Sequence, residues 1–238
     1  MLQRELEVCA ETLPAVEAAN AGGADRIELC AALGEGGVTA GVGFLREAIA
    51  ASTIPVHALV RPRSGNLVYS AAEFRTACAD AEMALSLGAA GIVVGTLTPD
   101  NEIDVMQTKE FLRIADGKPV TFHRAFDLTR DLHESLRLVM DLGCSRVLTS
   151  GGQPTVMEGI EMLRKLTKLA AGKIRIAAGG GVSLHNAALL ARVPGLDLHG
   201  SFRRKPKTED VRDVLWQQGQ AWVEADDVRA VAELVHHS

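Results

Sequence analysis

Four short segments of the chain alternate apolar and polar residues, and their polar members are acids, thiols, imidazoles and guanidiniums. The segments are Leu6–Cys9, Ile27–Cys30, Val56–Arg61 and Val120–His123. Alternation with a period of two predicts β-strands. A stretch with helical periodicity follows each segment, so the strands should be parallel, and buried parallel strands normally read as continuous apolar runs. One face of these strands therefore carries groups that are costly to bury without partners.

Four further apolar segments complete a set of about eight predicted strands, which is the number in a (β/α)8 barrel. They cover residues 91–96, 146–150, 174–178 and 196–199. The intervening segments read as helices: Ser70–Leu87, for example, opens with Ser70 and has Glu73 three residues later, which is a capping box. We predict an α/β fold with one domain over residues 1–238. A single TIM barrel is expected over about residues 5–202, followed by C-terminal helices over about residues 208–237, which contain Trp216 and Trp222.

Composition and charge exclude several classes of function. The chain has 238 residues, is 47% hydrophobic and carries a net charge of −5. It has no basic stripe interleaved with aromatic residues, so we expect no nucleic-acid partner. No apolar run is long enough to span a bilayer, and the N-terminal residues carry no targeting or lipidation signal. The four cysteines show no CxxC spacing, so a cytoplasmic protein with reduced thiols and no membrane association is expected.

Closing the sheet into a barrel places seven polar side chains in the lumen, namely Glu7, Cys9, Glu28, Cys30, His57, Arg61 and His123. Two glutamates in a lumen could perform acid–base chemistry, or they could neutralise an inward arginine. Cys9 and Cys30 fall at the same level of neighbouring strands, so their sulfurs could approach each other. Two thiols near imidazoles suit Cu(I), although buried cysteines also serve as small apolar residues.

The ends of the strands and the loops that follow them form the mouth of such a barrel, where its site is expected. His123, Arg124 and Asp127 crowd one strand end, as catalytic groups or as a salt-bridged corner. Arg61 and Arg63 leave the third strand, and their forked donors suit a carboxylate or a phosphate.

Glycine-rich loops follow the last two predicted strands, where many barrels bind phosphate through backbone N–H groups. Gly179, Gly180 and Gly181 follow the seventh strand, and Ser201 follows the eighth. No lysine lies at the carboxyl end of a strand, which argues against a Schiff-base aldolase.

Several segments together closely resemble the CutC family, and the resemblance extends from the first strand to about residue 201. The segments are Glu7–Cys9, Ala24–Cys30, Glu35–Thr39, Ile54–His57, Arg61–Arg63, Thr121–Asp127 and Arg146–Gly151. The resemblance implies a cytoplasmic TIM barrel with a role in copper homeostasis that forms homo-oligomers, and we expect a homodimer or a homotetramer. It also implies that Cys9 and Cys30 match a cysteine pair suggested as a Cu(I) site. His57, Arg61, His123 and Arg124 match other inward polar positions of the family.

Two functions are compatible with these residues. In the first, Cys9 and Cys30 bind Cu(I), with His57 or His123 as auxiliary ligands. In the second, the protein is an isomerase or lyase that acts on a small phosphorylated or carboxylated metabolite without a Schiff base. There Glu28 or His123 moves a proton, with Arg124 and Asp127 beside them, and the arginines and glycine-rich loops hold the anion. A scaffold without a small-molecule site is a third alternative.

Overall fold

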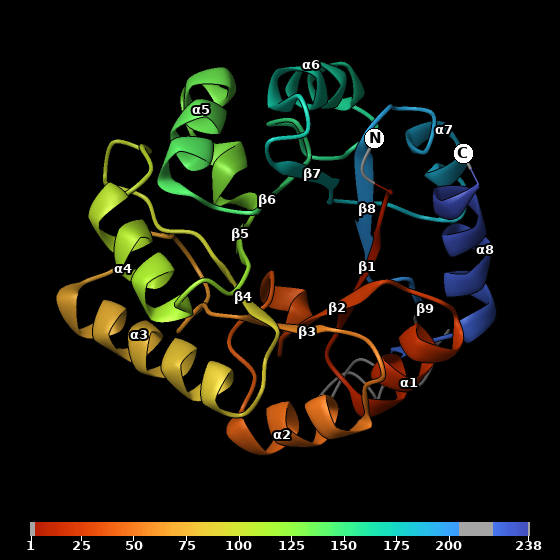
Figure 1. Cartoon of the computed structure of the whole chain (residues 1–238), viewed down its shortest axis with the longest axis horizontal. Helices are drawn as coiled ribbons and strands as arrows, with labels where there is room; N and C mark the ends of the chain where they lie inside the picture. The colour runs from red at the N-terminus through yellow and green to blue at the C-terminus, as the bar shows by residue number, and fades with distance from the viewer. Residues whose placement is uncertain (1–2, 205–220, 238) are drawn as a thin grey trace, which may run out of the picture.

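The computed structural model describes residues 3–204 and 221–237, and its centre is a closed barrel of eight parallel strands, as predicted (Figure 1). Neighbouring strands pair in chain order, and β1 closes the barrel by pairing with β8. The strands are β1 (Leu6–Ala10), β2 (Arg26–Leu29), β3 (Val56–Leu59), β4 (Gly91–Val94), β5 (Val120–Phe122), β6 (Arg146–Thr149), β7 (Arg175–Ala178) and β8 (Leu196–Gly200).

Helices surround the barrel and cover the outward faces of its strands (Figure 1). They are α1 (Leu13–Ala21), α2 (Val42–Ala51), α3 (Ala71–Ser86), α4 (Val105–Ala115), α5 (Leu132–Leu142), α6 (Ile160–Ala170), α7 (Ala187–Leu190) and α8 (Ala225–His236), with short 3-10 turns η1 (Leu33–Glu35) and η2 (Arg124–Leu128). The outward strand residues, such as Ile27, Ile92 and Phe122, are fully buried against these helices. The apolar core is therefore a shell between sheet and helices, which leaves the lumen to the polar residues.

Local sequence explains the helix boundaries. Ser70 caps α3 and Glu73 completes the predicted capping box, while Asp131 caps α5, which ends at Gly143 in the left-handed conformation that glycine favours. No helix in the described part of the chain is both long and apolar enough to cross a membrane.

The C-terminal segment differs from its prediction. Trp222 lies in a two-residue strand, β10 (Trp222–Val223), which pairs antiparallel with β9 (Arg203–Arg204) instead of forming a helix. Its indole N–H donates to Glu224, and the side chain is partly exposed. Helix α8 follows and packs on α1 and β1 (Figure 1). The part of the predicted helical segment between 208 and 220, with Trp216, lies outside the described residues.

Candidate functional site

A cavity of about 550 Å³ opens at the carboxyl ends of the strands, a volume typical of small-molecule sites. Most of the predicted site residues line it, namely Cys9, Glu28, Arg61, His123, Arg124, Asp127, Gly180, Gly181 and Ser201, and His199 joins them. Four predicted residues do not line the cavity, namely Cys30, His57, Arg63 and Gly179. The structure therefore brings together residues from β1, β2 and β8 with the loops that follow β3, β5, β7 and β8.

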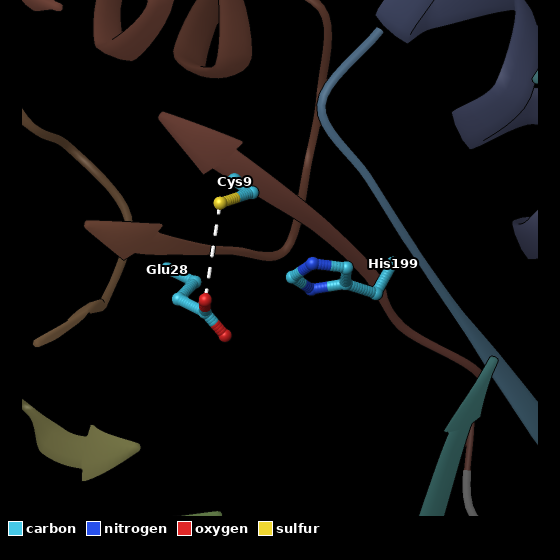
Figure 2. Close-up of side chains that lie close together, drawn as sticks. All are labelled: Cys9, Glu28 and His199. Carbon is cyan, nitrogen blue, oxygen red and sulfur yellow. Dashed lines mark hydrogen bonds between the residues drawn. The ribbon is translucent and has the colours of Figure 1, made fainter. Parts of the chain in front are cut away.

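The floor of the cavity holds three side chains that face one another, Cys9 from β1, Glu28 from β2 and His199 from β8 (Figure 2). A sulfur, a carboxylate oxygen and a ring nitrogen of these residues all lie within 4.8 Å of one another. The β-ladder explains the convergence, because Cys9 pairs with Glu28 on one side of β1 and Glu7 pairs with His199 on the other. The second carboxylate oxygen of Glu28, Oε2, is buried and has no hydrogen-bond partner among the described residues.

Glu7 holds His199 in place from below. Its Oε1 lies 2.7 Å from Nδ1 of His199, and its Oε2 accepts a hydrogen bond of 2.5 Å from Nε of Arg26. Glu7 is fully buried, and burial disfavours its charge, yet Arg26 and His199 outweigh burial and hold the pKa of Glu7 well below its ordinary value. Glu7 is therefore a permanent carboxylate, and it neutralises an inward arginine, which is one of the two alternatives that the sequence left open.

The two glutamates of the lumen consequently differ in charge. Burial raises the pKa of Glu28 to about 7, with the Glu7 carboxylate adding to the effect, while His199 and Arg26 oppose it. Burial works against the charged form of His199, but the carboxylates of Glu28 and Glu7 outweigh it and raise the pKa of the imidazole. Near neutral pH the floor of the cavity thus holds a titrating carboxyl group beside an imidazole whose pKa is raised, an arrangement suited to acid–base chemistry.

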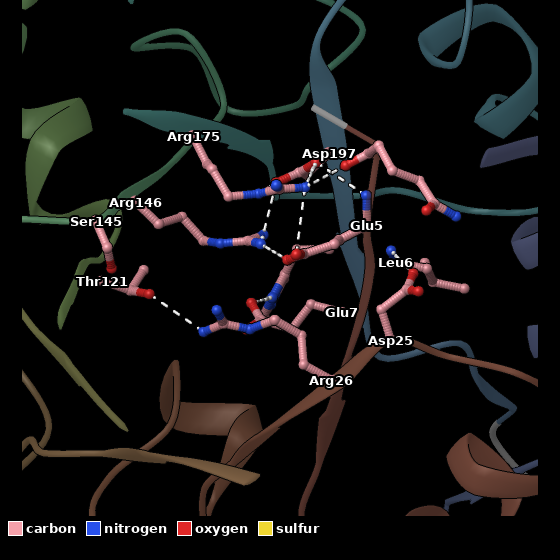
Figure 3. A network of polar contacts seen from close by, with 12 residues as sticks. Glu5, Leu6, Glu7, Asp25, Arg26, Thr121, Ser145, Arg146, Arg175 and Asp197 are labelled. Carbon is pink, nitrogen blue, oxygen red and sulfur yellow. Dashed lines mark hydrogen bonds and ion pairs between the residues drawn. The ribbon is translucent and has the colours of Figure 1, made fainter. Parts of the chain in front are cut away.

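Below the cavity, a network of ion pairs fills the amino-terminal end of the lumen (Figure 3). Arg146 is fully buried and binds Glu5 and, at 3.0 Å, Asp197, which also binds Arg175 at 2.7 Å. Nη2 of Arg26 reaches Oγ1 of Thr121 at 3.3 Å. Charged side chains from opposite sides of the barrel therefore close the lumen beneath the cavity.

His123 presents a neutral donor to the cavity. Its Nδ1 accepts a hydrogen bond of 3.0 Å from the backbone N–H of Ala125, so the ring proton belongs on Nε2, which is buried without a partner among the described residues. Burial, followed by the charge of Arg61, lowers the pKa of His123 to about 3. Gly95 makes room for the ring, because a Cβ there would lie 2.3 Å from its Cε1. His123 is thus a neutral hydrogen-bond donor and is poorly suited to accept a proton.

Arg124 and Asp127 form the corner that the sequence offered as an alternative to catalysis. Nε of Arg124 binds Asp127 at 2.9 Å, and its Nη2 donates to Ser150 at 2.8 Å. Asp127 also accepts hydrogen bonds from Thr149 and from the backbone N–H groups of Ser150 and Gly152. Because these donors engage both of its oxygens, Asp127 ties η2 to the loop after β6, while Arg124 remains at the mouth with a partly exposed side chain.

The two arginines after β3 have different surroundings. Arg61 lines the cavity, but its guanidinium donates to the backbone carbonyls of Glu35, Gly37 and Gly65, which fastens two loops together. Arg63 points away from the cavity and binds Glu73 at 2.5 Å on the surface of α3. The forked donors of Arg63 are therefore engaged in local structure at a distance from the predicted anion.

The two lumen cysteines lie close together, with their sulfurs 3.5 Å apart. Cys30 is fully buried in a small apolar cluster with Leu59 and Val93, whereas Cys9 reaches the cavity. The hydrogen bond with Cys30, burial and the Glu28 carboxylate raise the pKa of the Cys9 thiol well above its ordinary value. Linear coordination of Cu(I) with metal–sulfur bonds of about 2.3 Å places two sulfurs about 4.6 Å apart, so a shared ion would require these sulfurs to separate by about 1 Å.

The imidazoles expected beside this cysteine pair do not complete a metal site. His57 pairs with Glu28 in the ladder between β2 and β3, but it lies against Gly91 and does not line the cavity; burial, followed by the charge of Arg26, lowers its pKa to about 3. Among the described residues, the metal-ligating groups that converge are Cys9, Glu28 and His199. The raised pKa values of His199 and Cys9 oppose a bound cation, because both shifts favour the protonated forms, which do not ligate a metal.

Sequence reasoning missed the role of His199 and of Arg26 and Arg146. His199 was predicted only as the last residue of the eighth strand, although its parity with Asp197 also places its side chain in the lumen. Arg26 precedes Glu28 by two residues, so the period of two already places it in the lumen. The same signal would have identified the partner of Glu7 directly.

These features define a TIM-barrel protein with a mixed-charge site at the carboxyl ends of its strands. The sequence model of the CutC family matches residues 4–204, and this chain belongs to the CutC family. A family protein CutC from Bacteroides thetaiotaomicron is 43% identical over 211 residues, which cover 88% of this chain and 85% of the relative. One from Pasteurella multocida is 42% identical over 196 residues, or 82% and 80% of the two chains.

Solved structures agree with this assignment. The crystal structure of the putative copper homeostasis protein CutC from Streptococcus agalactiae superposes with a TM-score of 0.79 at 32% identity, covering 84% of this chain and 99% of that one. N-(5'-phosphoribosyl)anthranilate isomerase from Pyrococcus furiosus has a TM-score of 0.59 at 16% identity, with 99% and 100% covered, and shares the fold.

Proposed function

We propose that this protein is an enzyme that binds a small phosphorylated or carboxylated metabolite at the mouth of the barrel and transfers a proton through Glu28. The observation that carries the proposal is that one cavity is lined by the buried titrating carboxyl group of Glu28, the neutral N–H donor of His123 and the arginines Arg61 and Arg124. The reaction class is isomerisation or elimination without a Schiff base, since no lysine of residues 3–204 or 221–237 lines this cavity.

Arg124 and the loop after β7 are suited to the anionic end of the metabolite. Gly180 and Gly181 both have positive φ angles, and the backbone N–H groups of Gly180, Gly181 and Val182 have no acceptor in the described part of the chain. A Cβ on Gly180 would lie 2.9 Å from Cζ of Arg124, so only glycine lets the guanidinium lie against this loop. Free N–H groups beside a guanidinium form an anion-binding concavity.

A binding experiment tests the anion site. Isothermal titration with inorganic phosphate and with phosphoglycolate should show saturable binding to the whole chain, and Arg124→Gln should weaken it at least about 10-fold, as expected for loss of a charge-assisted hydrogen bond of 1.5–3 kcal/mol. Arg137→Gln, on the exposed face of α5, is the matched control. Equal binding by the Arg124 variant and the wild type, or no binding by either, would contradict the proposal.

The proton transfer has a separate test. A mixture of phosphorylated sugars and sugar acids incubated with the protein in D2O should gain carbon-bound deuterium, which mass spectrometry detects. Glu28→Gln should abolish the exchange and keep phosphate binding, because the amide cannot accept the proton. Exchange that persists in this variant would show that Glu28 is not the proton acceptor.

A second function, copper handling, is favoured by one specific observation, the 3.5 Å separation of the Cys9 and Cys30 sulfurs. The Streptococcus agalactiae relative carries the description of a putative copper homeostasis protein. On this proposal the chain binds one Cu(I) under reducing conditions, and replacing both cysteines by serine abolishes binding. Cys78→Ser, on helix α3, is the control. High-affinity Cu(I) binding that survives in the double variant would refute this function.

Location and assembly belong to the same proposal. Membership of the CutC family supports a cytoplasmic protein that forms homodimers or homotetramers. Size-exclusion chromatography with light scattering measures the oligomeric state directly, and a monomer at micromolar concentration would contradict it.

A further inference from the structure

We propose that His199 is the acid that works with Glu28, that Glu7 is the residue that positions it, and that the substrate is a small hydroxycarbonyl compound with an anionic group at its far end. This inference rests on the proposed function and specifies its chemistry. It assigns an acid role to His199 and a positioning role to Glu7, and the sequence predicted neither of these roles.

The geometry carries the pairing. Strands β2 and β8 both pair with β1, so Glu28 and His199 lean toward each other across Cys9, within 4.8 Å (Figure 2). Since Glu7 occupies Nδ1 of His199, the ring nitrogen left for the cavity is Nε2. Glu28 offers the unpartnered oxygen Oε2. A base and an acid this close can act on neighbouring atoms of one substrate.

Charged groups surround His199, and its carboxylate neighbours favour the protonated form of the imidazole. Glu7 on β1 and Glu28 on β2 are its carboxylate neighbours, the thiol of Cys9 lies beside it, and Arg26 and Arg146 stand behind Glu7. Glu7 is itself held as a carboxylate by Arg26 at 2.5 Å. A buried carboxylate on Nδ1 fixes both the tautomer and the orientation of a histidine, as in the orienting role of an acid in catalytic triads.

The step balances without any further reactant. A Glu28 carboxylate oxygen takes the proton from the hydroxyl-bearing carbon next to the carbonyl. The electron pair of that C–H bond forms a C=C bond, and the carbonyl oxygen takes a proton from Nε2 of His199, which gives an enediol. Return of the Glu28 proton to the former carbonyl carbon, with His199 recovering a proton from the other hydroxyl, completes an isomerisation.

This step defines the substrate class. The carbon that loses the proton and the oxygen that gains one are two bonds apart, which matches a base and an acid within 4.8 Å of each other at the cavity floor. His123 offers an additional neutral N–H for a hydroxyl or carbonyl oxygen. Arg124 and the N–H groups of residues 180–182 stand at the opposite, open end, so the far group is a phosphate or a carboxylate.

Phosphoglycolohydroxamate, a phosphorylated mimic of an enediolate, tests the inference by isothermal titration against phosphoglycolate. The wild type should bind the hydroxamate at least about 100-fold more tightly, as analogues of reactive intermediates do. His199→Gln should reduce this preference at least about 10-fold while it keeps phosphoglycolate binding. His133→Gln, near the start of α5, is the matched control.

Glu7→Gln tests positioning through the pH dependence of hydroxamate binding. Loss of the Glu7 charge lowers the pKa of His199, so the preference for hydroxamate should disappear at a lower pH than in the wild type, whereas Glu17→Gln on α1 leaves the profile unchanged. Circular dichroism shows whether each variant is folded. If Glu7→Gln does not fold, the loss or retention of the hydroxamate preference in His199→Gln decides whether the inference stands.

The outcomes separate the two proposals. Phosphoglycolate binding with no preference for the hydroxamate, or a preference that His199→Gln retains, overturns the role of His199 and leaves the anion site standing. Failure of the wild type to bind either probe overturns the proposed function together with this inference. Stoichiometric binding of Zn²⁺ that needs Cys9, Glu28 and His199 together would also overturn the acid–base pair, because His199 would then be a neutral ligand.

Discussion

Replacing Glu28 by glutamine should make the protein more stable at alkaline pH and leave its stability nearly unchanged at acid pH. Glu28 is 5% exposed, and its Oε2 has no partner among the described residues. Burial raises its pKa from 4.5 to about 7. The native state therefore holds the proton more tightly than the unfolded chain does. Ionising Glu28 costs stability because the charge has to be formed in the lumen.

The magnitude follows from the shift in pKa. A rise from 4.5 to about 7 corresponds to about 3 kcal/mol, at 1.36 kcal/mol for each pKa unit. The stabilisation is complete below pH 4.5 and is lost as the pH rises through about 7. Glutamine keeps the shape and does not ionise, but it also removes the attraction between Glu28 and His199, so about 3 kcal/mol is the upper figure. For a chain of this size it corresponds to a shift in Tm of roughly 6–12 °C.

Urea unfolding of the wild type and Glu28→Gln at pH 5 and at pH 8 measures this effect. The difference in the free energy of unfolding should move in favour of the variant between the two pH values, while Glu17→Gln, exposed on α1, should track the wild type. A difference that stays constant from pH 5 to pH 8 would refute the reasoning, because it would mean that Glu28 titrates alike in the folded and unfolded states.

Three further predictions concern the barrel wall. Phe122→Ala should lower the free energy of unfolding by about 3–5 kcal/mol, whereas His123→Ala and Arg124→Ala should each lower it by less than about 2 kcal/mol. Equal losses in urea unfolding would show that these polar residues have a structural role. Asp127→Ala should destabilise the protein more than Arg124→Ala, since it leaves the donors of three residues unpaired. A smaller loss of stability in Asp127→Ala would contradict the role of Asp127 in tying η2 to the loop after β6. Burial lowers the pKa of His57 from an ordinary value of 6.5 to about 3 in the folded protein, so its contribution to stability is lost as the pH falls from 6.5 toward 3. The difference in the free energy of unfolding between the wild type and His57→Gln should therefore become smaller from pH 7 to pH 4. A difference that does not depend on pH would count against burial of a neutral imidazole.

The period-two alternation was sufficient to predict the barrel and most of its lumen. Side chains in a strand alternate between two faces, so the polar positions in β1, β2 and β5 had to share the face opposite the helices. The placement of Phe122 in the outer shell and of His123 in the lumen follows from that rule alone. Glycine and serine at the ends of α3 and α5 likewise act through local geometry, which the sequence displays.

Pairings across the barrel could not be predicted in the same way, because they depend on register. Cys9 and Cys30 appear level in the sequence, but the stagger of the barrel pairs Cys9 with Glu28. Whether a guanidinium is free also depends on distant backbone: Arg61 meets three carbonyls from two loops, and Arg63 meets Glu73. Residue type alone does not distinguish these partners from a ligand.

The ion pairs at the amino-terminal end of the lumen have a consequence for how the barrel assembles. Glu5 and Arg146 are separated by 141 residues, and Arg175 and Asp197 lie still further along the chain. Arg146 and Asp197 both lie in the carboxyl-terminal half of the chain, whereas Glu5 lies at its amino-terminal end. A half-barrel of β5–β8 would therefore bury the Arg146 guanidinium without one of its two carboxylates, which is costly for a buried charge. Closure of the seam between β1 and β8 is therefore coupled electrostatically to the packing of β6 and β7, which makes partly closed forms unfavourable and folding of the barrel cooperative.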